Sequence, residues 1–76
     1  MSPWRPCKRR DFIHKLQRLG FTGPYSGARH HFLVFQHYRL ALPSNSEYSV
    51  PQLQMMLDEV EAILQRRITP NEWARL

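Results

Sequence analysis

The stretch HHFLVFQHYRLAL, residues 30–42, decides the fold, because it holds two short apolar runs separated by two polar residues. Residues 30–35 and 38–42 are rich in aromatic and aliphatic side chains, which favour β-strands. Gln36 and His37 between them leave room for a tight turn. We therefore predict an antiparallel hairpin.

Alternation along this hairpin predicts which face is buried, because side chains two positions apart share one face of a strand. We expect the core face to carry the four apolar residues Leu33, Phe35, Leu40 and Leu42. That choice sends His30 and Arg39 to the opposite, more hydrated face.

The segments before the hairpin predict a helix and an irregular strand. Residues 1–7 contain Pro3, Trp4 and Pro6 and are expected to be a lead-in, because proline removes a backbone donor and restricts the residue before it. Apolar residues from Phe12 to Leu19 recur at helical spacing, so we predict a helix over 8–19 that ends at Gly20. Residues 21–43 are assigned to a sheet of two or three strands.

The segments after the hairpin predict two more helices. Residues 43–48 are interpreted as a polar loop, and Ser49 is a candidate N-cap for a helix over 50–65. The run Thr69-Pro70-Asn71-Glu72 matches a capping box and predicts a short helix over 70–76. The order helix, small antiparallel sheet, helix, short helix predicts one α+β domain over residues 1–76.

Composition and charge narrow the function. The chain has 76 residues and a net charge of +5, and residues 1–40 carry eight basic side chains against one acidic side chain. Such a concentration of positive charge favours a polyphosphate partner, although it can also serve solubility alone.

The longest apolar run, 32–35, is far too short to cross a membrane, so we expect a cytoplasmic protein. With a single cysteine, Cys7, neither an intrachain disulfide nor a multi-cysteine zinc site is expected.

Two adjacent histidines supply the candidate chemistry. His30 and His31 follow a glycine-containing turn and come directly after Arg29. An imidazole can move the proton of an RNA 2′-hydroxyl while a guanidinium holds the phosphate, so neither a metal nor a cofactor is required. Neighbouring residues of a strand point to opposite faces, which disfavours a shared metal ion. The alternative interpretation is that His31 packs in the core and His30 only decorates the surface.

Three aromatic residues of the hairpin, Phe32, Phe35 and Tyr38, have two interpretations. They can form a platform on which RNA bases stack, or they can belong to the core. A domain of this size has few large apolar side chains to spare, which favours the core.

The order of motifs resembles the HicA family of bacterial toxins, small ribonucleases that are paired with HicB antitoxins. Four segments carry this resemblance: Leu19-Gly20-Phe21, residues 23–32 (GPYSGARHHF), Arg39-Leu40-Ala41-Leu42-Pro43, and Ile68-Thr69-Pro70-Asn71-Glu72-Trp73. The resemblance implies a fold similar to a double-stranded-RNA-binding domain. It also implies a single catalytic histidine just after the glycine turn, which would be His30, with His31 as the fallback. Where the family's second helix is commonly basic, this one carries an acidic run over 58–61.

Together these observations predict an mRNA interferase, a metal-independent endoribonuclease that a HicB-like antitoxin holds inactive and that is monomeric when free. Arg29 and Arg39 are expected to hold phosphate, and Lys8, Arg9 and Arg10 to add nonspecific attraction for RNA. The alternative is a noncatalytic module that binds RNA or an acidic protein through the same basic surface.

Overall fold

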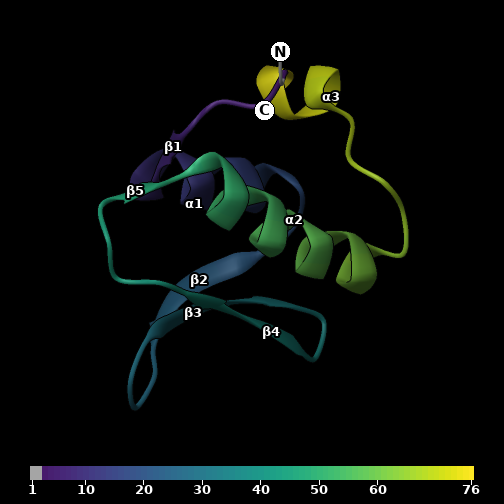
Figure 1. Ribbon diagram of the computed structural model, residues 1–76. Coiled ribbons are helices and arrows are strands. Elements are labelled where there is room, and N and C mark those ends of the chain that lie inside the picture. Colours follow the sequence, from purple (N-terminus) through teal and green to yellow (C-terminus); the bar gives the residue numbers. More distant parts are fainter. Residues whose placement is uncertain (1–2) are drawn as a thin grey trace.

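The computed structural model describes residues 3–76 and confirms an α+β architecture. Its elements are, in order, β1 (Cys7–Lys8), α1 (Arg9–Arg18), β2 (Thr22–Ser26), β3 (His31–Phe35), β4 (Tyr38–Leu42), β5 (Glu47–Tyr48), α2 (Val50–Leu64) and α3 (Pro70–Arg75). Helices α1 and α2 cover one side of the sheet formed by β2, β3 and β4, and α3 lies at the far end beside the first described residues, Pro3 and Trp4 (Figure 1).

The predicted hairpin forms between β3 and β4. Leu33 pairs with Leu40 and Phe35 pairs with Tyr38, which leaves Gln36 and His37 as the turn. Gln36 adopts a positive φ of 56°, so the turn closes without glycine. Strand β2 adds to the other edge of β3, with an irregularity between Thr22 and Tyr25, and completes a three-stranded sheet.

Helix α1 ends just before Gly20, as the sequence predicts. Gly20 has a φ of 107°, a conformation that L side chains rarely adopt. The next residue turns back, because the backbone N–H of Phe21 donates to the carbonyl oxygen of Leu16 at 3.0 Å. The Phe21 side chain is buried and fixes how the chain enters β2.

Side-chain caps start α2 and α3 as predicted. The Ser49 hydroxyl accepts from the backbone N–H of Gln52 at 3.3 Å, and the Thr69 hydroxyl accepts from that of Glu72 at 3.1 Å. The reciprocal half of the capping box is absent, however. The Glu72 carboxylate instead forms a bidentate ion pair with Arg66, with both N–O distances at 2.8 Å.

The main correction concerns a second, two-stranded sheet. Cys7 was assigned to a lead-in and Tyr48 to a polar loop, yet Cys7 pairs with Tyr48 and Lys8 with Glu47 to form the β1–β5 ribbon. Tyr48 is fully buried and its hydroxyl donates to the carbonyl oxygen of Pro43 at 2.8 Å. The ribbon therefore ties the start of α1 to the loop that precedes α2.

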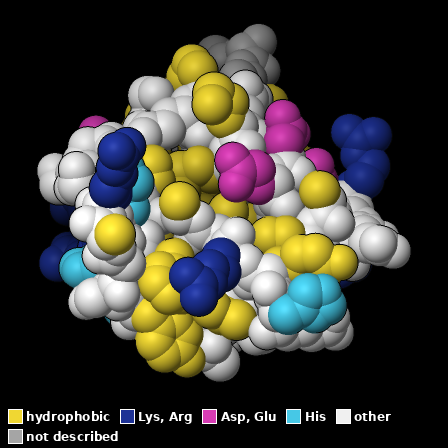
Figure 2. Space-filling view, turned by 90° about the horizontal axis from the view of Figure 1, so that it is seen from below, with side chains coloured by type: hydrophobic (Ala, Val, Ile, Leu, Met, Phe, Trp, Pro, Cys, Tyr) yellow, Lys and Arg dark blue, Asp and Glu magenta, His cyan; other side chains and the backbone are white. Residues whose placement is uncertain are grey.

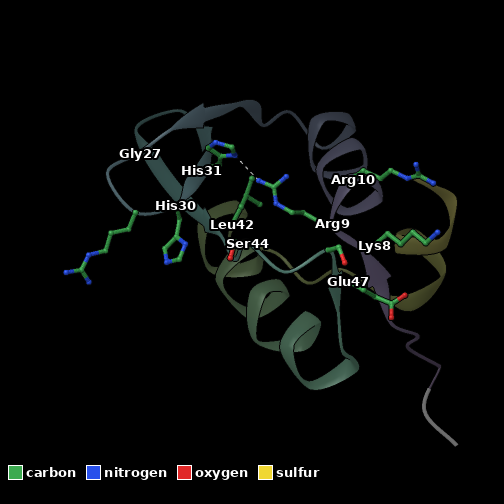
Figure 3. A pocket seen from close by; sticks show the side chains of 11 residues that line it. Lys8, Arg9, Arg10, Gly27, His30, His31, Leu42, Ser44 and Glu47 are labelled. Carbon is green, nitrogen blue, oxygen red and sulfur yellow. Dashed lines mark hydrogen bonds between the residues drawn. The ribbon is translucent and has the colours of Figure 1, made fainter.

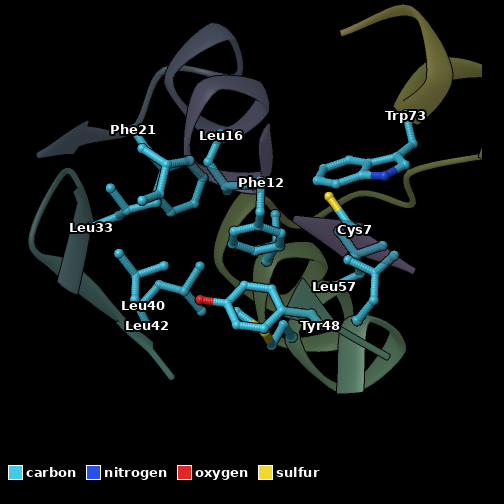
Figure 4. Packing of buried hydrophobic residues seen from close by; sticks show 14 of the residues in the cluster. Cys7, Phe12, Leu16, Phe21, Leu33, Leu40, Leu42, Tyr48, Leu57 and Trp73 are labelled. Atoms are coloured by element: carbon cyan, nitrogen blue, oxygen red, sulfur yellow. The ribbon is translucent and has the colours of Figure 1, made fainter. Parts of the chain in front are cut away.

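The core lies between the sheet and the helices (Figure 4). The Phe12 ring is its centre, with the rings of Tyr48 and Trp73 each 5.6 Å away between centroids. Leu33, Leu40 and Leu42 are buried as predicted, while Phe35 is only partly buried at the edge of this cluster. Among residues 3–76, no helix lies over the opposite face of the sheet (Figure 1).

Candidate functional site

One pocket brings together most of the residues that the sequence predicts to be functional. It has a volume of about 970 Å³ and opens to solvent between the start of α1 and the turn that precedes β3 (Figure 3). Its lining comprises Lys8, Arg9, Arg10, Gly27, Arg29, His30, His31, Leu42, Ser44, Ser46 and Glu47. The lining thus includes four basic residues, two histidines and a single glutamate. In Figure 3 the Arg9 side chain points toward His31, whereas the side chains of Lys8 and Arg10 extend away from the two imidazoles.

The start of α1 contributes three consecutive basic residues, Lys8, Arg9 and Arg10. Positive charge at a helix N-terminus is unfavourable, by about 0.3–1 kcal/mol for each exposed charge, because it opposes the helix dipole. Asp11 in the first turn offsets only part of this. Stability alone does not account for such a cluster, whereas an anionic ligand in the pocket would relieve it.

The turn over residues 27–30 presents His30 to the pocket. The backbone N–H of Gly27 donates to the carbonyl oxygen of His30 at 3.0 Å and closes the turn. A Cβ at position 27 would collide with that same carbonyl oxygen, so only glycine fits here. The glycine that the sequence places before the histidines is therefore what sets the position of His30.

The His30 side chain is exposed, and within residues 3–76 its imidazole has no hydrogen-bond partner. Both ring nitrogens are therefore available to a ligand. In Figure 3 the ring points into the pocket, toward the side where Ser44 lies.

His31 is not packed in the core, which settles one of the alternatives left by the sequence. Its side chain is exposed, and its Nδ1 lies 3.0 Å from Nη2 of Arg9. A guanidinium has donors and no acceptor, so Nδ1 of His31 must accept. The ring proton then resides on Nε2, which becomes a hydrogen-bond donor.

Arg9, which the sequence predicts only to attract RNA, also makes contacts within the protein that the sequence did not predict. Its Nε is buried and has no hydrogen-bond partner among the described residues. Its charge also acts on the buried Tyr48: burial raises the pKa of that phenol, and the nearby guanidinium of Arg9 opposes the increase. Arg9 thus lies between the core and the pocket and fixes the direction of the His31 ring.

Arg39 does not join the other predicted phosphate ligands. It lies on the outer face of the sheet, as alternation predicted, with its guanidinium carbon 4.5 Å from the centroid of the Phe32 ring. Arg39 is therefore not part of the pocket that Arg29 lines, and its expected contact with phosphate stays a prediction.

The loop between β4 and β5 supplies a wall that sequence analysis did not assign. Ser44, Ser46 and Glu47 line the pocket because the β1–β5 ribbon holds this loop against α1. The carbonyl oxygen of Ser46 accepts from the backbone N–H of Arg9 at 2.9 Å. No sequence periodicity indicates so short a pairing, and only the polarity of residues 44–47 hinted at a solvent-facing role.

Within residues 3–76 no three His, Cys, Asp or Glu side chains gather so that they could hold a metal ion. None of the helices in that range combines the length and apolar character that a bilayer crossing demands.

Comparison with known proteins adds no relative: no family model matches this chain, and neither a curated protein nor a solved structure matches it. The resemblance to HicA toxins therefore depends on the sequence segments quoted above.

Proposed function

We propose that this protein is an endoribonuclease in which His30 moves the proton of an attacking 2′-hydroxyl. The observation that supports it is the position of an unpartnered imidazole in a pocket lined by Lys8, Arg9, Arg10 and Arg29. Basic side chains attract the RNA backbone and stabilise the charge that develops on phosphate during attack.

The two histidines have different roles in this proposal. His31 is fixed by Arg9 and offers an N–H at Nε2, so it donates a hydrogen bond to a phosphate oxygen. His30 has no such restraint and serves as the general base. Arg29, adjacent to it in the same turn, neutralises the phosphate.

The proposed reaction needs no metal ion or cofactor. His30 removes the proton from the 2′-hydroxyl, and the 2′-oxygen forms a bond to the adjacent phosphorus. The bond from phosphorus to the 5′-oxygen then breaks, and that oxygen leaves with a proton from His30 or from water. The products are a 2′,3′-cyclic phosphate and a 5′-hydroxyl.

Resemblance to HicA toxins extends the proposal to the biological partners. On that basis the substrate is mRNA in the cytoplasm, and a HicB-like antitoxin blocks the pocket. A partner that closes a pocket with four basic side chains is expected to present acidic residues to it.

The test compares His30→Ala with His37→Ala, a matched change at an exposed histidine outside the pocket. Cleavage of an RNA is measured in the presence of a metal chelator, and the product ends are identified by mass spectrometry. We expect His30→Ala to lower the cleavage rate by about 10²–10⁴-fold, as loss of a general base does, and His37→Ala to leave it unchanged.

Three results would contradict this assignment. Cleavage by His30→Ala at the wild-type rate would exclude His30 as the base. Loss of activity in the chelator would exclude the metal-independent route. Salt-sensitive RNA binding by the wild-type protein without any cleavage would favour the alternative, a noncatalytic RNA-binding module.

A further inference from the structure

The outer face of the three-stranded sheet carries a cluster with one residue from each strand: Tyr25 on β2, Phe32 on β3 and Arg39 on β4. The Tyr25 and Phe32 ring centroids are 5.6 Å apart and the planes are inclined by 38°. The guanidinium of Arg39 lies over the Phe32 ring at 4.5 Å. We call these three residues the outer cluster.

The outer cluster is not part of the core. Tyr25 is 46% exposed, Arg39 is exposed, and none of the described helices covers this face of the sheet (Figure 1). Seen from below, a basic side chain lies across a hydrophobic patch, and the acidic side chains lie apart from it (Figure 2). The Arg39 guanidinium over the Phe32 ring is therefore a surface feature outside the hydrophobic core.

Charge favours an anionic partner here. Residues 12–46, which include the whole sheet, contain no aspartate or glutamate. The other residues that share this face with the cluster in the strand register, Thr22, Val34 and Ala41, are uncharged. Nothing on this face repels a polyanion, and Arg39 attracts it.

The outer cluster is continuous with the pocket through Gly27. This residue lines the pocket, and a Cβ built on it would lie 3.3 Å from the Phe32 ring. Its backbone N–H meanwhile holds the carbonyl oxygen of His30. A nucleotide strand with a phosphate in the pocket can therefore pass over residue 27 and reach the cluster with its next base.

We propose that the outer cluster is a stacking subsite for one unpaired RNA base adjacent to the phosphate in the pocket. It rests on the proposed function, since it assigns the substrate of the same site to single-stranded RNA. The exposed Tyr25 ring and the guanidinium plane of Arg39 both offer surfaces on which a base stacks. A duplex keeps its base faces inside the helix, so it cannot use this subsite.

The test uses two fluorescein-labelled oligonucleotides of about ten nucleotides with 2′-O-methyl riboses, one with bases and one abasic, and measures their binding by anisotropy. Methylation prevents cleavage through the 2′-oxygen. Because stacking contributes about 1–3 kcal/mol per base, we expect the wild-type protein to bind the strand with bases at least about fivefold more tightly.

Substitutions at Tyr25 and Tyr38 test whether the outer cluster causes the tighter binding of the strand with bases. Tyr25→Leu should bring the ratio of the affinities for the strand with bases and the abasic strand close to one. Tyr25→Phe should keep the wild-type ratio. Tyr38→Leu is the matched control, because Tyr38 is equally exposed, at 43%, but pairs with Phe35 on the other face of the sheet. Tyr25→Leu removes no charge, so the salt dependence of binding should not change.

Equal wild-type affinity for both strands, or equal losses in Tyr25→Leu and Tyr38→Leu, would overturn the subsite. So would a dimer in sedimentation experiments that Tyr25→Leu dissociates, because the face would then bind a second copy. These outcomes are distinguishable from failure of the nuclease proposal. RNA cleavage without a preference for the strand with bases would contradict only the stacking subsite, and such a preference without cleavage would contradict only the nuclease activity.

Discussion

The guanidinium of Arg9, at the first turn of α1, donates to Nδ1 of His31 at 3.0 Å, across 22 positions of sequence. This contact joins a helix N-terminus to the first residue of a strand. It also distinguishes the two histidines, because the contact fixes the orientation of the His31 ring and no such contact restrains the His30 ring.

Arg9→Ala is predicted to release the His31 ring. In the wild-type protein, nitrogen NMR shifts of neutral His31 should report an unprotonated Nδ1 and a protonated Nε2. In the variant the two tautomers should mix. Identical tautomer populations in both proteins would contradict this assignment.

Gly27→Ala is predicted to distort the turn that carries His30. The new Cβ meets the His30 carbonyl oxygen, which is backbone and cannot move alone. We expect a loss of about 1–3 kcal/mol in the free energy of unfolding, measured in urea, together with weaker RNA binding. Ala28→Ser, at the exposed next position of the same turn, should stay within about 0.5 kcal/mol of wild type. Equal stability of the two variants would show that the turn tolerates a side chain at residue 27.

Acid is predicted to weaken the attachment of α3. The hydrogen-bonded guanidinium of Arg66 lowers the pKa of the Glu72 carboxyl below its ordinary 4.5. A lowered native pKa stabilises the fold above the unfolded value, and this contribution disappears as the pH falls through the native pKa. The Tm of the wild-type protein should therefore exceed that of Glu72→Gln near neutral pH, and the difference should shrink in acid. A difference that is independent of pH would exclude the ion pair as its cause.

The Cys7 thiol is predicted to react slowly. Burial raises its pKa above the ordinary 9.0, with the charge of Lys15 opposing the increase, and the side chain is only 7% exposed. Alkylation requires an accessible thiolate. At neutral pH we expect the native rate to be lower than the rate in urea by on the order of tenfold or more. Equal rates would mean that the β1–β5 ribbon opens freely.

Sequence patterns were sufficient where a local rule controls the structure. Alternation gave the hairpin and the burial of Leu33 and Leu40, and hydroxyl caps gave the starts of α2 and α3. The β1–β5 ribbon follows no such rule, because two residues show no period and Tyr48 stands in a polar stretch. The burial of Tyr48 depends on the contact of its ring with Phe12, which only tertiary packing creates.

The same distinction holds for the pocket. The glycine turn and the adjacent charge indicated His30 and Arg29, which do lie together. The Arg9–His31 contact could not be anticipated, because it depends on how α1 meets the sheet. Arg39 was placed on the correct face, but that face is not the one that forms the pocket.

The pairing of Cys7 with Tyr48 has a consequence for synthesis of the protein. During translation the basic start of α1 emerges first, and the partner strand that completes the opposite wall emerges only after the whole hairpin has been made. Closing so long a loop is entropically unfavourable until Tyr48 is buried. A nascent chain should therefore gain its cavity late, in the same step that consolidates the hydrophobic interior.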